Sequence, residues 1–252
     1  MSLKKYRTST TLALLAAMTL MTAPASHAAL AGYSQDFEGL NQADSGALAA
    51  DGWLVGANVF APDGTSFLYN YFTFPAPNGG AAFSGIDIGQ GGPAQGNQQL
   101  VVYNDYNNAD HGNGTGNRIE ANVFQEQIIG AGDEGTSWTF SFDAKQGNIG
   151  GASTALAFIK VLDPNAGFNL TDFVVVDTTS IGPNWGSYSM DVDIDAGQAG
   201  QILQFGFLNV ASNGDPSGMF YDNINFRPVP VPGAVWLLLS GFAALAGLRR
   251  KA

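Results

Sequence analysis

Strict alternation of apolar and polar residues constrains the fold of this chain more than any other feature. In residues 137–145 every second residue is apolar, and the residues between them are Ser, Thr, Asp and Lys; the apolar set is Trp138, Phe140, Phe142 and Ala144. Residues 187–195 repeat the pattern, with four apolar residues between serines and aspartates. Because successive side chains of a strand point to opposite faces, both stretches are predicted to be strands with one buried and one solvated face, as in antiparallel sheets.

Nine further stretches are predicted to be strands, namely residues 33–38, 53–60, 67–74, 99–104, 118–128, 155–162, 173–177, 201–210 and 218–226. Several are apolar on both faces, which predicts central strands or strands beneath long loops. Clusters of Gly and Asn separate them, and only residues 41–50 suggest a short helical turn. About eleven short strands in one domain predict an all-β fold, an antiparallel β-sandwich of the jelly-roll type.

The charge distribution excludes several classes of partner. All 21 acidic residues lie within residues 29–227, with only four basic ones, which leaves this part a formal charge of −17. Such a surface repels nucleic acid and anionic lipid but attracts divalent cations. The chain has no Cys, so disulfides cannot stabilise it, and His111 is the only histidine of this part, which argues against a His-rich zinc site.

The N-terminal residues 1–28 have the pattern of a signal peptide. Lys4, Lys5 and Arg7 precede an apolar run over residues 12–21, and Ser26-His27-Ala28 forms a small-residue cleavage site. A transmembrane helix is the alternative, but the apolar run is short and Pro24 follows it. We therefore expect an exported protein that begins at Ala29.

The C-terminal residues 228–252 have three parts in a fixed order. Val229, Pro230, Val231 and Pro232 precede an apolar run over residues 234–248, and Arg249, Arg250 and Lys251 close the chain. At ~1.5 Å per residue the run reaches about 22 Å as a helix, against roughly 30 Å of hydrocarbon. A buried core helix is the alternative, but it would not need three terminal cations, which the positive-inside rule places in the cytoplasm. We expect a single transmembrane helix.

This tripartite tail resembles the PEP-CTERM sorting signal of bacteria that secrete exopolysaccharide. The resemblance implies processing by exosortase, a membrane protease. The usual Glu between the prolines is replaced by Val231, which leaves open which enzyme of this type would process the tail. The tail covers about a tenth of the chain and gives a destination, not an activity. The domain between the two ends is expected to span residues 29–227.

Three short motifs resemble jelly-roll carbohydrate-binding modules and their galactose-binding-like relatives. They are residues 35–39 with the Gly52-Trp53 pair, residues 184–189, and residues 220–224. In those modules an acidic residue of the first strand and an Asp of the last often hold a structural calcium ion. The resemblance carries these roles to Glu38 and Asp222; the alternative is that both are ordinary solvated carboxylates.

A second acidic cluster contains Asp105 and Asp110 and precedes a Gly-rich stretch. These two residues could line a loop calcium site. Their spacing does not match the D-x-D-x-D-G pattern, however, so an Asx-rich turn is favoured.

Recognition of sugars needs aromatic rings with a free face and polar side chains nearby. The candidates for ligand binding are Trp53, Tyr69, Tyr71, Tyr103, Tyr106 and Trp185. For any single one of them packing inside the fold is favoured, because a binding platform needs two or more rings on one exposed face. Trp138 is in line with Phe140 and Phe142 and is assigned to the core.

Catalysis has little support in the sequence. A serine triad would have to use His111, no G-x-S-x-G motif is present, and with 21 acidic residues any choice of a catalytic pair is arbitrary. We predict a noncatalytic, exported protein of the envelope or extracellular matrix, associated with exopolysaccharide or biofilm and binding carbohydrate with structural calcium. It would be held in the inner membrane until processing releases it to the cell surface. The alternatives are a polysaccharide-active hydrolase or lyase and a purely structural or adhesive coat protein.

Overall fold

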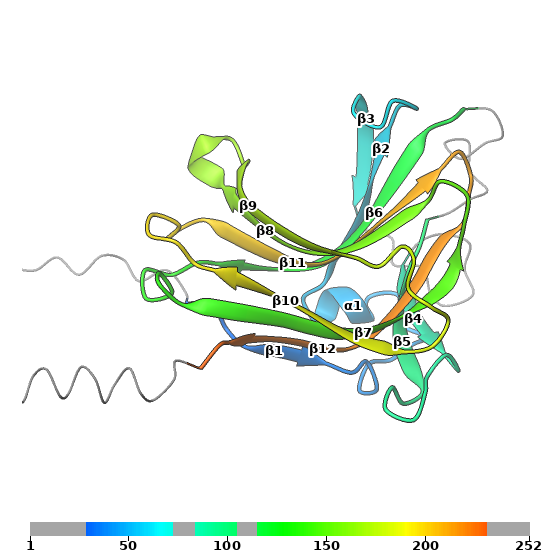
Figure 1. Ribbon diagram of the computed structural model, residues 1–252, viewed down its shortest axis with the longest axis horizontal. Helices are drawn as coiled ribbons and strands as arrows, with labels where there is room; N and C mark the ends of the chain where they lie inside the picture. The colour runs from blue at the N-terminus through cyan, green and yellow to red at the C-terminus, as the bar shows by residue number, and fades with distance from the viewer. Residues whose placement is uncertain (1–28, 73–83, 105–114, 231–252) are drawn as a thin grey trace, which may run out of the picture.

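The computed structural model describes residues 29–72, 84–104 and 115–230, and the side chains of residues 71 and 72 lie outside this description. Two antiparallel sheets face each other (Figure 1). Sheet 1 has the order β10–β7–β12–β5–β4, and β1 also pairs with β12; its strands are β10 (Gly186–Asp193), β7 (Ser137–Ile149), β12 (Ser217–Pro228), β5 (Gln98–Val102), β4 (Gly85–Ile88) and β1 (Tyr33–Gln35). Sheet 2 has the order β3–β2–β6–β11–β8–β9; its strands are β3 (Phe67–Phe72), β2 (Leu54–Phe60), β6 (Arg118–Ile128), β11 (Ile202–Ser212), β8 (Thr154–Asp163) and β9 (Asn169–Asp177). The predicted all-β sandwich is confirmed.

The core lies between the sheets and is rich in aromatic rings. The alternating residues of β7 turn inward as predicted, and Phe140 packs against Phe205 and Phe207 of sheet 2 with ring centroids 5.3 and 5.7 Å apart. Two rings of β12 stack on the same pair: Tyr221 on Phe207 at 3.6 Å and Phe226 on Phe205 at 4.3 Å. These contacts join the central strands of both sheets, so burial of apolar surface here is the main stabilising term.

Several local features differ from the predictions. Strand β4 was not predicted, because its four residues are too few for alternation to indicate a strand; it pairs with β5. Strand β1 ends at Gln35, three residues early, since Phe37 adopts a left-handed backbone with φ of 59°. The helical turn predicted over residues 41–50 is the single turn α1 (Ala47–Ala50), which buries Ala47 and Leu48.

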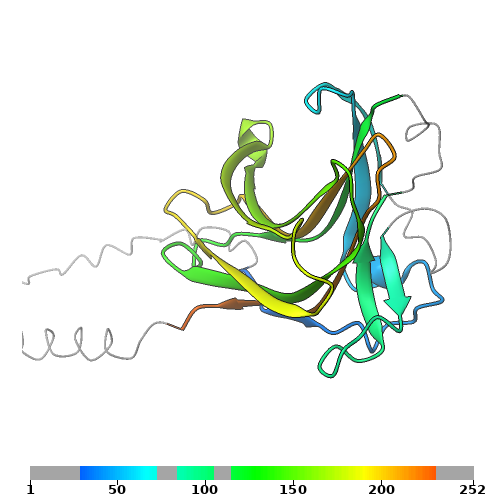
Figure 2. The same ribbon diagram turned by 45° about the vertical axis from the view of Figure 1, so that its right-hand side comes forward.

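Sheet 2 is strongly curved. In Figures 1 and 2, β2 and β3 rise on one side and β8 and β9 bend upward on the other, so the face turned away from sheet 1 is concave. We call this surface the outer face of sheet 2. Between residues 29 and 230 as described, no other element lies over it in these views.

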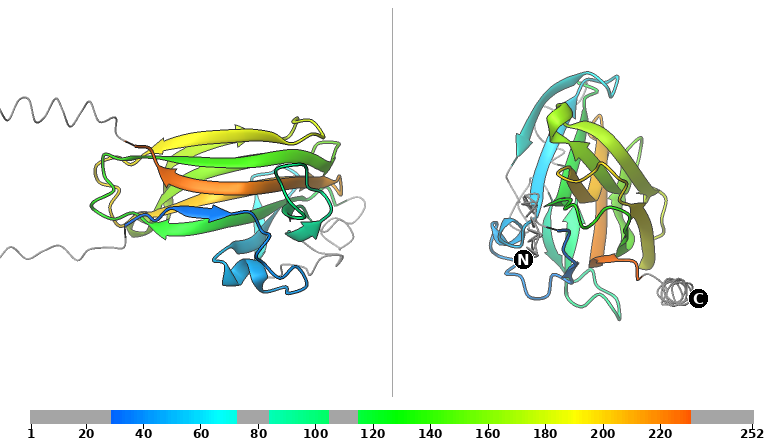
Figure 3. Two further views of the ribbon diagram at one scale, coloured as in Figure 1. Left: turned by 90° about the horizontal axis from the view of Figure 1, so that it is seen from below. Right: turned by 90° about the vertical axis from the view of Figure 1, so that its left-hand side faces the viewer.

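The two described ends of the chain leave from the same end of the sandwich (Figure 3). The amide of Leu30 donates to Asp133 Oδ2 at 2.8 Å, and that of Val229 donates to the Ser137 carbonyl at 2.8 Å. Asp133 lies in the connection between β6 and β7, and Ser137 is the first residue of β7. The described part contains no helix long and apolar enough to span a membrane, and the tail over residues 234–248 lies outside it.

Candidate functional site

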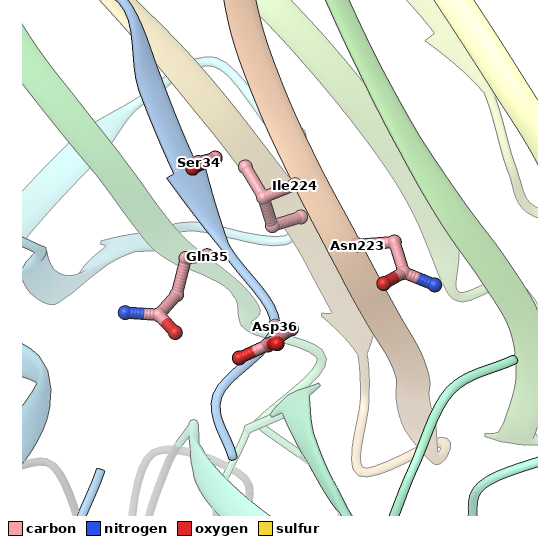
Figure 4. Close-up of a pocket in the computed structure, with 5 residues that line it drawn as sticks. All are labelled: Ser34, Gln35, Asp36, Asn223 and Ile224. Carbon is pink, nitrogen blue, oxygen red and sulfur yellow. The ribbon is translucent and has the colours of Figure 1, made fainter. Parts of the chain in front are cut away.

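The first candidate site lies where β1 ends beside β12. Strand β12 carries a bulge there, because Asp222 pairs with Asp143 while Asn225 pairs with Ser141. Asn223 in the bulge has a φ of 49° and donates through Nδ2 to Asp143 Oδ2 at 2.8 Å. A pocket of about 270 Å³ opens at this point, lined by Ser34, Gln35, Asp36, Asn223 and Ile224. Figure 4 shows Asp36 just beyond β1, opposite Asn223 and Ile224 on β12.

Asp222 is buried beside this pocket and is incompletely satisfied. Its Oδ1 accepts the Asn223 amide at 2.6 Å, whereas its Oδ2 is buried without a hydrogen-bond partner. Burial raises the pKa of Asp222 to about 7, and the negative charges of Asp143, Asp36 and Glu38 act in the same direction. The fold therefore gathers, around one buried carboxyl, acidic groups that are far apart in the sequence.

The oxygens at the bulge bear on whether a calcium ion can bind there. Ca²⁺ takes six to eight oxygen ligands, including amides and carbonyls. Asn225 Oδ1 is a second buried oxygen without a partner, on the other side of the bulge from Asp222. Among the described residues no three His, Cys, Asp or Glu side chains converge closely enough to hold a metal by themselves. A calcium ion at this point would therefore need further ligands from amides, backbone carbonyls or water.

Glu38, the other predicted calcium ligand, has a different contact. Its Oε1 accepts the backbone amides of Asn97 and Gln98, both at 2.6 Å, and so fixes the connection between β4 and β5 to the end of β1. The side chain is exposed. Asp105, Asp110 and Tyr106 lie outside the described residues, as does the side chain of Tyr71.

The remaining predicted aromatic residues do not lie on one face. Trp53 is 1% exposed, and its indole N–H donates to the Tyr33 hydroxyl at 2.7 Å, so it is a core residue, as the packing interpretation predicts. Trp185 is half-buried beside sheet 1, where its N–H donates to the Gln90 carbonyl at 3.0 Å. Tyr69 is 42% exposed on β3 at the edge of sheet 2, and Tyr103 is half-buried after β5. The period-2 pattern alone could not separate these environments.

The second candidate site is the outer face of sheet 2, which sequence reasoning did not identify as a site. The register aligns one residue from each of five strands in a row across the sheet: Leu54, Phe124, Gly206, Phe158 and Val175. The rings of Phe124 and Phe158 lie on either side of Gly206, 6.4 Å apart. Phe158 is fully buried although it points away from the core, whereas Leu54 and Val175 are each 42% exposed. An apolar row thus crosses the concave face.

Polar side chains border this row on both sides. On one side, Asn58 and Asn122 both donate to Glu120 Oε1, at 3.0 and 2.9 Å. On the other side, Gln204 Nε2 donates to Glu126 Oε2 at 2.6 Å, and Lys160 is the register partner of Gln204. The only signal in the sequence was that several central strands are apolar on both faces.

Comparisons with known proteins find distant structural similarity only. No family model matches the chain, and no curated protein matches it in sequence. The active domain of tailspike protein 4 of bacteriophage CBA120 is 16% identical with a TM-score of 0.41, and the match covers 71% of this chain and 19% of that one. The CBM22-1 xylan-binding domain of Paenibacillus barcinonensis Xyn10C is 13% identical with a TM-score of 0.42, covering 83% of this chain and 100% of that one. A cyclase from Fischerella is 14% identical with a TM-score of 0.44, covering 80% and 98%. These similarities are too low to assign a ligand or an activity.

Proposed function

We propose that this chain is a noncatalytic carbohydrate-binding protein of the jelly-roll type, and that its glycan lies across the outer face of sheet 2. The observation that supports this is the apolar row bordered by amide and carboxylate side chains on a concave surface. A pyranose ring has an apolar face of C–H groups and a rim of hydroxyls, and such ligands bind where apolar side chains are combined with a few polar groups. The exposed ends of the row, Leu54 and Val175, together with Phe173 provide the first, and the bordering residues provide the second.

A glycoside hydrolase or lyase is the competing function, and the spacing of the acids disfavours it. The two carboxylates on β6 that face the ligand surface are Glu120 and Glu126, six residues apart on one strand. At about 3.3 Å per residue their backbones are roughly 20 Å apart. Glycosidases hold their two carboxyl groups about 5 to 10 Å apart. A binding role therefore fits this face better than hydrolysis.

The test is to incubate the protein with exopolysaccharide from its source and to measure both retention of the polymer and release of oligosaccharides. Retained polymer of unchanged length is expected. Phe173 is 46% exposed on the outer face of sheet 2, where its ring is expected to contact the glycan. Phe173→Ala should therefore weaken retention of the polymer by about fivefold or more. Ile88→Ala, at a 49% exposed position on sheet 1, is the matched control. Released oligosaccharides would support an enzyme, and neither retention nor turnover would support a structural or adhesive coat protein.

We also propose that a calcium ion binds beside the β12 bulge, held by Asp222 and Asn225 with Asp36 at the pocket rim. The two buried oxygens without partners support this site. A bound cation would link the first and last strands of the sandwich and offset the burial of the Asp222 carboxylate. Chelation should lower the melting temperature, and added Ca²⁺ should restore it. An unchanged melting temperature would contradict this calcium site.

We further propose that the protein is exported and sorted to the cell surface by an exosortase-type protease acting on the tail. The proposal rests on the patterns of residues 1–28 and 228–252. The common exit of both described ends at one end of the sandwich is compatible with it. Mass spectrometry of the surface form should find a mature chain that begins at Ala29 and lacks the Arg249-Arg250-Lys251 end; released protein that keeps this end would contradict processing.

A further inference from the structure

Lys160 and Gln204 form a polar pair with unused hydrogen-bonding capacity on the outer face of sheet 2. They are register partners on the adjacent strands β8 and β11, and they stand beside the apolar row. Their neighbours on the same strands, such as Ile159 and Phe205, point into the core, so both side chains point to the concave side. The inference drawn from this pair rests on the glycan-binding function proposed above.

Gln204 has a free acceptor. It is 7% exposed, and its Nε2 is fixed by Glu126 Oε2 at 2.6 Å, which orients the amide. Its Oε1 is buried and accepts no hydrogen bond. A buried acceptor left without a donor costs about 1–3 kcal/mol. A ligand that donates a hydrogen bond to this oxygen would remove that cost.

Lys160 has a free donor. Its Nζ lies over the rings of Phe158 and Phe124, 4.8 and 5.5 Å from their centroids, and has no acceptor among the described residues. Burial lowers the pKa of Lys160, while Glu120 and Glu126 oppose the shift. The other three cations of the described domain lie elsewhere: Arg118 packs against the Gly64 turn, Lys145 donates to Gln90, and Arg227 lies at the end of β12.

We propose that Lys160 and Gln204 are the specificity-determining residues of this face, and that they select neutral sugars by their hydroxyl groups. A hydroxyl can donate to Gln204 Oε1 and also accept from Lys160 Nζ, so one hydroxyl or a neighbouring pair satisfies both. A uronate carboxylate can accept from Lys160 but has no proton for Gln204. The carboxylate would also be repelled by Glu126, which accepts the hydrogen bond from Gln204, and by the net negative charge of a domain with 21 acidic and four basic residues.

The experiment uses matched polymers. Binding of the exported protein to β-glucan, mannan and galactan is compared with binding to the same polymers oxidised at C6 to uronates. At least one neutral polymer should bind, and oxidation should weaken its binding by about tenfold or more. Gln204→Leu and Lys160→Met should each weaken neutral binding by roughly fivefold, the loss of one hydrogen bond. Lys160→Arg should recover part of it, and Lys145→Met on sheet 1 should change nothing.

The outcomes separate this inference from the proposed function. If no polymer of either series binds, both fail. If neutral polymers bind but Gln204→Leu and Lys160→Met bind equally well, glycan binding stands and the role of this pair is overturned. Tighter binding of the oxidised series would overturn the selection of neutral sugars. Thermal melting of each variant shows whether a loss of binding reflects unfolding, and partial recovery in Lys160→Arg distinguishes a lost contact from a disturbed sheet.

Discussion

At the scale of single residues, the hydroxyl of Tyr33 joins two buried polar groups near the start of the sandwich. It accepts from Trp53 Nε1 at 2.7 Å and donates to Asp51 Oδ2. Burial and the Asp51 carboxylate raise the pKa of Tyr33. Tyr33→Phe leaves the Trp53 N–H without a partner in the core, so it should lower the free energy of unfolding by about 1–3 kcal/mol in urea titrations.

Tyr188→Phe is the control for Tyr33→Phe. The Tyr188 ring stacks on Phe142 at 5.8 Å, and its hydroxyl makes no hydrogen bond to a described residue. Its removal should change stability little. An equal loss in both variants would mean that the hydrogen bonds of the Tyr33 hydroxyl do not account for the effect.

The raised pKa of Asp222 makes stability depend on pH. Between about pH 4 and about pH 7 the folded protein keeps the Asp222 proton that the unfolded chain has lost, so the native state binds more protons. In EDTA, the free energy of unfolding should therefore fall as the pH rises through this window and level off above it. Asp222→Asn should flatten that slope. Ca²⁺, which competes with the proton, should stabilise the wild-type protein at pH 8 and have no effect at pH 4.

At the scale of elements, β11 requires glycine at position 206. A Cβ there would lie 2.2 Å from the Val123 carbonyl oxygen and 2.6 Å from the Phe124 Cα, both of them backbone atoms of β6. Neither atom can move without disturbing the central ladder of sheet 2. Gly206→Ala should cost about 3 kcal/mol in urea titrations. Gly182→Ala, in the loop before β10 with no atom within 4 Å, should be neutral.

Alternation predicted where strands lie better than which of their faces is buried. Strand β6 was predicted at its observed limits, 118–128, and β7 begins at the predicted Ser137. In sheet 2 the same rule could not say which apolar face is buried, because β6, β8 and β11 carry apolar side chains on both faces. Pairing in the sheet decided it: Ile159 and Val161 pack in the core, while Phe158 and Lys160 face outward.

At the scale of the whole molecule, the sandwich closes through its last strand. Strand β12 lies between β7 and the strands β5 and β1, and it brings Tyr221 and Phe226 into the core. A chain of residues 29–230 should unfold in one cooperative transition by circular dichroism. A chain that ends at residue 216 should lack that transition, because sheet 1 loses its centre; a cooperative transition in the shorter chain would contradict this account.

The sequence by itself determined the all-β class, most strand positions and the acidic character of the domain, because these depend on local alternation and on counted charges. Tertiary structure alone decided the sites. Leu54 and Val175 are 121 residues apart and come into one row only through the register of five strands, and Asp222 meets Asp36 only because β1 pairs with β12. Alternation assigns a side chain to one of two faces, but which face curves inward, and which oxygen is left buried without a partner, depends on how the strands pair and bend.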